Sequence, residues 1–237
     1  MSTLLEVRGL NAWYGAAHVV LDVDLQVQRG EVVGLMGRNG AGKSSTLKAI
    51  MGLMPRRTGE IRFAGSEISH APTHEVARRG LGFVPENRRI FSELTVLENL
   101  EVGRQAPRRW PDGTDAPLWT PEKLFQVFPN LASMLDRLGS RMSGGEQQML
   151  AVARTLMGNP LLVLLDEPTE GMAPLIVEQM ARMIQALKTQ GVSVLLSEQN
   201  EHFAAMVCDR VYLSDQGQVR AAAHGRMNAM PDRLDPT

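Results

Sequence analysis

The segment that most constrains this chain runs from Gly37 to Ser44 and matches the pattern G-x-x-x-x-G-K-[ST] without a mismatch. The apolar run 32–36 before it predicts a short buried strand, and residues 45–51 after it predict a helix. Between a strand and a helix, glycines allow main-chain N–H groups to turn inward around phosphates, and the helix N-terminus adds partial positive charge. The sequence therefore predicts a site for ATP or GTP.

The candidate phosphate-binding residues, called the phosphate loop below, follow one another along the chain. They are Gly37, Arg38, Asn39, Gly40, Ala41, Gly42, Lys43, Ser44 and Ser45. Lys43 is expected to reach the β- and γ-phosphates, and the Ser44 hydroxyl is expected to bind Mg²⁺. A glycine-rich turn with a chance lysine is the alternative, but it leaves the flanking strand and helix unexplained.

A second block pairs two carboxylates with a buried strand. The apolar run 161–165 ends in Asp166 and Glu167, and such a run is typical of a strand buried on both faces of a parallel sheet. Carboxylates at the C-terminal end of such a strand reach the ligand crevice. Asp166 is expected to hold Mg²⁺ through water, and Glu167 to polarise a water for attack on the γ-phosphate. Two solvated acids before the helix that Pro174 begins are the alternative.

The third block, Met142 to Gln148, has two readings. The spacing of Ser143 and Glu146 is that of a capping box at the start of an amphipathic helix. Gly144 and Gly145 are costly in a first helical turn, and their benefit there is the close approach of an anion to bare N–H groups. We therefore expect these four residues to form a second phosphate clamp, which serves the nucleotide of a different subunit.

With these three blocks in order, the chain resembles an ABC-type ATPase subunit, the nucleotide-binding engine of a membrane transporter. The resemblance covers Leu4 to about Val219. It implies that two subunits sandwich two ATP molecules between the phosphate loop of one chain and residues 143–145 of the other. It also implies that Tyr14 stacks on adenine, which we favour over the alternative that Trp13-Tyr14-Gly15 is a plain turn with an amphipathic aromatic side chain.

At three positions the sequence departs from the family pattern, and these residues indicate a subgroup within the family. Glu86 stands where the family has a Mg²⁺-contacting glutamine, Gln199 where it has a histidine, and Ala173 where it has an aspartate. These variants are similar to those of ATP-binding subunits of branched-chain amino acid importers and their urea and amide relatives. Glu86 is still able to ligate Mg²⁺, its charge offset by Arg88 or Arg89. Gln199 is able to donate a hydrogen bond to phosphate but cannot titrate as histidine does.

The resemblance implies an α/β fold: a P-loop NTPase core with a mixed, mainly parallel sheet, an N-terminal antiparallel β subdomain and an inserted α-helical subdomain. We expect one domain over 1–237, with the core in about 1–85 and 161–225, the helical part in about 86–160, and a polar tail at 226–237. The expected helices of the inserted part cover 95–100, 121–128 and 131–138. Residues 105–120 read as a loop, in which Trp110 and Trp119 cover the local core or contact a partner, and we favour the first reading.

Composition limits the partners and the location. The formal net charge of −1 offers nothing to attract nucleic acid, and a single cysteine, Cys208, is compatible with a reducing compartment. The sequence begins without a secretory signal and contains no apolar run of the ~18–20 residues needed to span a bilayer. We therefore expect a cytoplasmic protein, peripheral on the inner face of the cell membrane through transmembrane permease subunits. An extracytoplasmic substrate-binding protein would act with it only indirectly.

The leading functional hypothesis is an ATP-hydrolysing energy-coupling subunit of an importer for branched-chain or hydrophobic amino acids, with ATP and Mg²⁺ as cofactors. Its expected catalytic residues are Glu167, Lys43 and Gln199. The same motor for urea or short-chain amides is the first alternative, and a soluble ABC ATPase acting on DNA or ribosomes is the second. Export is also open, since the permease sets the direction of transport. The partner ATPase is either a second copy or a sister chain.

Overall fold

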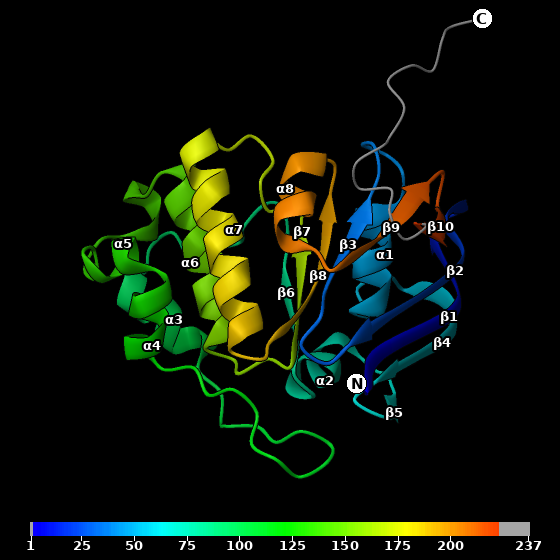
Figure 1. Cartoon of the computed structure of the whole chain (residues 1–237), viewed down its shortest axis with the longest axis horizontal. Coiled ribbons are helices and arrows are strands. Elements are labelled where there is room, and N and C mark those ends of the chain that lie inside the picture. Colours follow the sequence, from blue (N-terminus) through cyan, green and yellow to red (C-terminus); the bar gives the residue numbers. More distant parts are fainter. Residues whose placement is uncertain (1, 223–237) are drawn as a thin grey trace, which may run out of the picture.

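The computed structural model describes residues 2–222 and contains two sheets flanked by helices (Figure 1). The larger sheet has six strands in the order β10-β9-β3-β8-β7-β6, and only the pair β9–β10 is antiparallel. Its strands are β3 (Val32–Met36), β6 (Leu81–Val84), β7 (Leu162–Asp166), β8 (Ser193–Glu198), β9 (Arg210–Asp215) and β10 (Gln218–Ala221). The expected mixed, mainly parallel sheet is confirmed, and the polar tail expected at 226–237 lies outside the described residues.

Both faces of this sheet are covered, which explains the uninterrupted apolar runs. Alternate residues of β7 enter two separate hydrophobic cores: Leu162 and Leu164 pack into one, Val163 and Leu165 into the other. Figure 1 shows α6 and α7 on one side of the sheet and α1 on the other. The covering helices are α1 (Lys43–Ile50), α6 (Gly144–Leu156), α7 (Pro174–Thr189) and α8 (Glu201–Val207).

The smaller sheet is antiparallel and has the order β2-β1-β4-β5, which confirms the expected N-terminal β subdomain. Its strands are β1 (Thr3–Tyr14), β2 (Ala17–Gln28), β4 (Arg56–Phe63) and β5 (Ser66–Glu67). Apolar side chains of β1, including Leu5 and Val7, pack into the same core as α1. The first helix is therefore held between the two sheets, with its N-terminus at the C-terminal end of β3.

The short helix α2 (Thr73–Arg78) lies between β5 and β6, before the inserted part. The inserted part contains short helices joined by turns: α3 (Val96–Gly103), α4 (Pro121–Val127), α5 (Pro129–Ala132) and a 3-10 turn at Gly139–Arg141. The helix predicted over 131–138 is wrong, because the regular helix ends at Ala132. The carbonyls of Leu135 and Arg137 accept the N–H groups of Leu97 (3.1 Å) and Val96 (3.0 Å), which begin α3. Bonds to a distant helix end thus replace the helical bonds that the spacing predicted.

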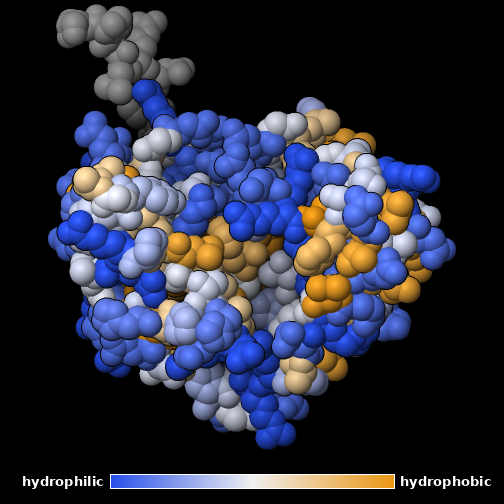
Figure 2. Space-filling model, turned by 180° about the vertical axis from the view of Figure 1, so that it is seen from behind, coloured by the Kyte–Doolittle hydropathy of each residue, from blue (hydrophilic) through white to orange (hydrophobic). Residues whose placement is uncertain are grey.

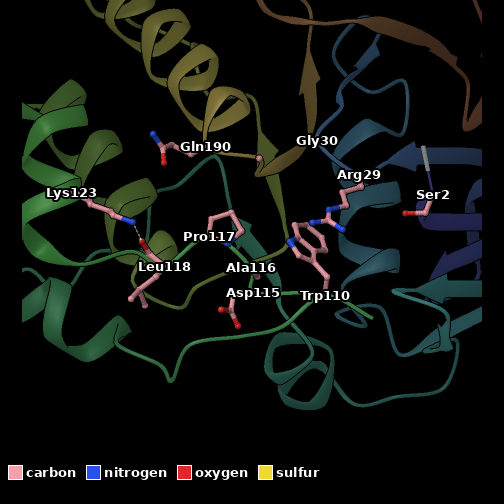
Figure 3. A pocket seen from close by; sticks show the side chains of 11 residues that line it. Ser2, Arg29, Gly30, Trp110, Asp115, Ala116, Pro117, Leu118, Lys123 and Gln190 are labelled. Carbon is pink, nitrogen blue, oxygen red and sulfur yellow. Dashed lines mark hydrogen bonds between the residues drawn. The ribbon is translucent and has the colours of Figure 1, made fainter. Parts of the chain in front are cut away.

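The loop before α4 carries both tryptophans, and both are buried, which confirms that they cover the local core. The Arg29 guanidinium lies 4.0 Å from the centre of the Trp110 ring, and Figure 3 shows the two stacked beside a cavity of about 760 Å³. Trp119 donates its main-chain N–H to Asn159 Oδ1 at 2.7 Å. Among residues 2–222, no helix combines the length and the apolarity needed to cross a membrane.

Candidate functional site

The phosphate loop connects the end of β3 to the start of α1, as the sequence predicts. Gly42 precedes the helix with φ 98°, a left-handed conformation that glycine adopts without strain. At Gly37, an added Cβ would lie 2.3 Å from the carbonyl oxygen of Ser214, so only glycine fits there. The Ala41 carbonyl accepts the Ser214 hydroxyl (2.8 Å) and the Gly217 N–H (2.9 Å). The β9–β10 region therefore supports the loop from outside.

Lys43 extends back over this loop and is 3% exposed. Its ammonium donates to the carbonyls of Gly37 (2.7 Å) and Arg38 (3.0 Å) and lies 2.8 Å from Glu167 Oε1. The charge of Lys43 is thus placed between the phosphate loop and the end of β7, where a polyanion approaching the loop would meet it.

Asp166 and Glu167 lie buried where β7 ends. Asp166 Oδ1 accepts the Ser197 hydroxyl at 2.8 Å, and the main-chain N–H of Glu167 donates to Ser197 Oγ at 3.0 Å. Within the described residues, Asp166 Oδ2 and Glu167 Oε2 have no hydrogen-bond partner. Buried carboxylate oxygens need a donor or a cation, and these two are therefore free to bind one.

The oxygen atoms available at this site fit a Mg²⁺ ion that binds mainly to the phosphates of a nucleotide and to few protein side chains. The part of the chain that the structure describes holds no cluster of three or more His, Cys, Asp or Glu side chains placed to hold a metal. Mg²⁺ usually binds one or two carboxylates together with waters and phosphate oxygens, so it does not need such a cluster. The orphaned Asp166 Oδ2 supplies one hard oxygen of this kind.

The pKa of the Glu167 carboxyl is raised, chiefly because the group is buried. The hydrogen bond and the charge of Lys43 oppose this shift, whereas the negative charges of Glu198 and Glu170 add to it. A carboxylate with a raised pKa is a stronger base than an exposed one. Glu167 is therefore suited to take a proton from water.

Two residues of the candidate site that were not predicted from the sequence, Ser197 and Glu198, lie at the end of β8. Ser197 is paired with Asp166 in the β7–β8 register, and its hydroxyl is hydrogen-bonded to both Asp166 and Glu167. Glu198 is 1% exposed, and its carboxylate accepts N–H groups of Thr169, Gln199 and Asn200. A signal existed in the sequence: both polar residues directly follow an apolar run, as Asp166 and Glu167 do.

The variant residues Glu86 and Gln199 are both exposed, and neither has a contact that tests its expected role. Glu86 lines a cavity of about 460 Å³ together with Arg88, Arg89 and Gln147. No hydrogen bond or ion pair between described residues joins Glu86 to Asp166 or to either arginine. Their assignments to Mg²⁺ and to phosphate stay predictions.

The third block forms the start of α6, and its capping box is complete. The Glu146 N–H donates to Ser143 Oγ (3.3 Å), and the Ser143 N–H donates to Glu146 Oε2 (2.7 Å). The two glycines also make room within the chain. A Cβ on Gly144 would lie 3.0 Å from Arg88 Nη1, and one on Gly145 would lie 3.0 Å from Ile176 Cγ1. Capping and packing thus explain these residues within one subunit, and the phosphate clamp stays a prediction.

Tyr14 ends β1 at a tight hairpin and is 48% exposed. The ring of its neighbour Trp13 is instead occupied by other side chains: His18 stacks on it with centroids 4.3 Å apart, and the Arg56 guanidinium lies 4.5 Å from the ring centre. Tyr14 therefore remains available to a planar ligand.

Fold and site together define a nucleoside triphosphatase built on a phosphate loop, and comparisons with known proteins agree. The family model described as "ABC transporter" matches residues 20–170, more than half of the chain. A high-affinity branched-chain amino acid transport ATP-binding protein of Pseudomonas aeruginosa is 39% identical over 91% of each chain. A lipopolysaccharide export system ATP-binding protein of Escherichia coli is 37% identical over 93% of this chain and 90% of its own. A solved nucleotide-free ATP-binding cassette from an ABC transporter has a TM-score of 0.76 at 26% identity, covering 93% and 90% of the two chains.

The chain belongs to the ABC transporter family. It is an ATP-binding subunit of the family, and it hydrolyses ATP.

Proposed function

We propose that this chain is the energy-coupling ATPase of an importer for branched-chain or other hydrophobic amino acids. The observation that carries the chemistry is the buried group of Lys43, Asp166 and Glu167 between the phosphate loop and the end of β7. The amino acid cargo rests on the Pseudomonas aeruginosa relative, which is similar over 91% of both chains. It also rests on the three variants Glu86, Ala173 and Gln199.

In this proposal the phosphate loop, from Gly37 to Ser45, binds the triphosphate through its main-chain N–H groups. Lys43 turns from Glu167 and the loop carbonyls to the phosphates. Ser44, Asp166 and Glu86 supply oxygens for Mg²⁺, which neutralises phosphate charge when it is bound. The position of Asp166 Oδ2, buried and without a partner among the described residues, supports this assignment.

Glu167 then accepts a proton from the attacking water, and Gln199 donates a hydrogen bond to a phosphate oxygen. The raised pKa of Glu167 supports its role as the base, because burial makes its carboxylate more basic. Nucleotide binding and activation of water are coupled through the Lys43–Glu167 ion pair. Lys43 leaves the Glu167 carboxylate when the triphosphate offers it stronger anionic partners, and the carboxylate is then able to accept a proton.

A second ATPase subunit, identical or a sister chain, completes each site. Ser143, Gly144, Gly145 and Glu146 would clamp the nucleotide of the facing subunit, and Tyr14 would stack on adenine. The exposure of Ser143 and Tyr14 supports contacts outside the chain.

Transmembrane permease subunits are the second kind of partner, and they would hold the protein at the cytoplasmic face of the membrane. The large hydrophobic side chains of Phe91, Leu97 and Val102 are exposed on or near α3. Figure 2 shows a hollow near the middle of one face and a group of hydrophobic side chains beside it, on the half of the molecule that holds the inserted helices. Exposed apolar groups of this kind are typical of protein contact surfaces. An extracytoplasmic substrate-binding protein would deliver the cargo to the permease.

The test is purification of the tagged chain from detergent-solubilised membranes of its own host, followed by uptake measurements. We expect a polytopic permease and a second ATPase subunit to co-purify. We also expect deletion of the gene to abolish uptake of radiolabelled leucine, and the wild-type gene but not its Glu167→Gln variant to restore it. Lost uptake of urea or a short amide with normal leucine uptake would assign the alternative cargo. Co-purification of lipopolysaccharide export components, or of ribosomes, would overturn the importer assignment.

A further inference from the structure

Glu198, at the end of β8, forms hydrogen bonds to three segments around the candidate nucleotide site. Its main-chain carbonyl accepts the N–H of Gly37, the first residue of the phosphate loop, at 3.2 Å. Its carboxylate Oε1 accepts the N–H (3.2 Å) and the hydroxyl of Thr169. Oε2 accepts the N–H groups of Gln199 (3.1 Å) and Asn200 (3.0 Å). One buried side chain therefore joins two loops, and its backbone joins a third.

We propose that Glu198 is a positioning residue. Its carboxylate links the loop after β7 to the loop after β8, and this link, called the Glu198 clasp below, fixes the positions of Glu167 and Gln199 relative to each other around the triphosphate. The inference rests on the proposed function, because it assumes the roles proposed there for Glu167 and Gln199.

Four hydrogen-bond donors surround the Glu198 side chain, and only a carboxylate accepts from all of them. Each oxygen of Glu198 receives two donors, and an ionised carboxylate is an acceptor at both oxygens. In glutamine one oxygen is replaced by an NH₂ group, which would face N–H donors on one side whichever way the amide turned. Glutamine with its NH₂ toward Thr169 would lose the bond from the Thr169 N–H and keep only a contact to the hydroxyl, and with its NH₂ toward the other loop it would lose the bonds from Gln199 and Asn200. The link between the two loops is therefore weakened in either orientation.

The clasp also extends toward the start of α6. Thr169 lies in the loop 167–173, and its carbonyl accepts the N–H of Met172 at 3.1 Å. This loop leads into α7, where Ile176 packs against Gly145 closely enough that an added Cβ would lie 3.0 Å from Cγ1. A shift of Thr169 would thus be transmitted to the segment proposed to meet the second subunit's nucleotide.

The experiment compares Glu198→Gln and Thr169→Val with a matched control, Glu31→Gln. Glu31 is also a hydrogen-bonded carboxylate, accepting from Gln28 N–H (2.8 Å) and from Arg210, but it lies before β3, at the opposite end of the sheet. We expect Glu198→Gln to lower the kcat of MgATP hydrolysis about tenfold or more, with a smaller change in KM, since hydrogen bonds to a charged group are lost. Glu31→Gln should keep the wild-type kcat and KM, whatever it does to the melting temperature.

A second measurement tests the link between the loops directly. Thr169→Val removes one donor from the β7 loop, and we expect the amide protons of Gln199 and Asn200 on the other loop to exchange faster with deuterium. A purely local role of Thr169 would leave that exchange unchanged. This variant also decides the matter if Glu198→Gln does not fold.

Two results would overturn the inference: wild-type kcat in Glu198→Gln, or unchanged exchange at residues 199–200 in Thr169→Val. A wild-type chain that fails to hydrolyse ATP would instead contradict the proposed function. In that case the exchange measurement still decides whether the clasp exists, so the two failures are distinguishable.

Discussion

Lys43 Nζ lies 2.8 Å from Glu167 Oε1, and both side chains are buried. The residue expected to bind phosphate is thus held by the residue expected to activate water. A buried ion pair of this kind compensates two charges that are each costly to desolvate. In the proposed mechanism, triphosphate binding exchanges the Glu167 partner of Lys43 for a phosphate oxygen, which would free the Glu167 carboxylate for the attacking water.

Replacement of Glu167 by glutamine should separate binding from hydrolysis. The amide keeps the shape and one acceptor for Lys43 but loses the charge and the basicity. We expect ATP hydrolysis to fall about 100-fold or more, as is usual when a general base is lost. We expect ATP affinity to equal or exceed that of wild type, because the lysine is less strongly held, and the variant should accumulate as a closed dimer with ATP. Equilibrium binding, steady-state hydrolysis and size-exclusion chromatography measure these outcomes. Unchanged turnover would refute the assignment of the base.

Removal of Lys43 should lower both ATP affinity and stability, and a second substitution should restore only the stability. Lys43→Ala takes away the phosphate ligand and leaves Glu167 buried without its partner, so we expect weaker ATP binding and a loss of about 3 kcal/mol in the free energy of unfolding. The double variant Lys43→Ala/Glu167→Gln should recover most of the stability and none of the ATP affinity. Urea unfolding and nucleotide titration distinguish the two effects. Near-wild-type affinity in the single variant would count against the phosphate role.

Ser197→Ala tests the support of the carboxylate pair. The Ser197 hydroxyl donates to Asp166 Oδ1 and accepts the N–H of Glu167, so its loss leaves a buried carboxylate and a buried N–H less satisfied. We expect hydrolysis to fall about tenfold and half-maximal activity to require more Mg²⁺. The control is Ser193→Ala at the other end of β8, where the hydroxyl accepts the Gly30 N–H. Equal losses in the two variants would mean that Ser197 acts only through stability.

The elements that could be predicted from the sequence are those whose signals are local. The strand at 32–36 is found at the predicted residues, and α7 begins at Pro174 as its fixed backbone angle favours. The helix predicted over 131–138 failed because carbonyls of this segment accept N–H groups from the start of α3, about 40 residues away in the chain. Periodicity carries no information about such a partner.

The residues of the candidate site also fall into those with a local signal in the sequence and those without one. The phosphate loop and the pair Asp166-Glu167 were predictable, because each pattern is contiguous. Ser197 and Glu198 also follow an apolar run, but their partners Asp166 and Thr169 are identified only when β8 lies beside β7. The packing of Arg88 on Gly144 was missed for the same reason, since it joins residues more than 50 positions apart.

The pH dependence of hydrolysis should show no titration of a histidine at the switch position. Gln199 stands there and carries no ionisable group, while the nearby His202 is exposed at the start of α8. We expect the pH–rate profiles of wild type and His202→Ala to superimpose between about pH 6 and 7. An ionisation in that range that disappears in His202→Ala would make His202 the functional replacement for the missing histidine.

The Cys208 thiol should react only slowly in the folded protein. It packs against Gly34, where an added Cβ would lie 2.9 Å from its sulfur, and burial raises the pKa of the thiol to about 12, helped by the negative charges of Asp209 and Glu198. A thiol reagent at pH 8 should therefore label it slowly in buffer and rapidly in urea, because the thiolate is the reactive form.

The same shift fixes the sign of a stability effect. The folded state holds the proton of Cys208 to higher pH than the unfolded state does, so the thiol contributes stability below about pH 9 that is lost progressively as pH rises toward 12. We expect the free energy of unfolding of wild type to fall faster above pH 9 than that of Cys208→Ala, which has no thiol to ionise. Parallel urea titrations at increasing pH measure the difference. Parallel curves for the two proteins, or rapid labelling in buffer, would show that the thiol is accessible to water and ionises like an exposed one.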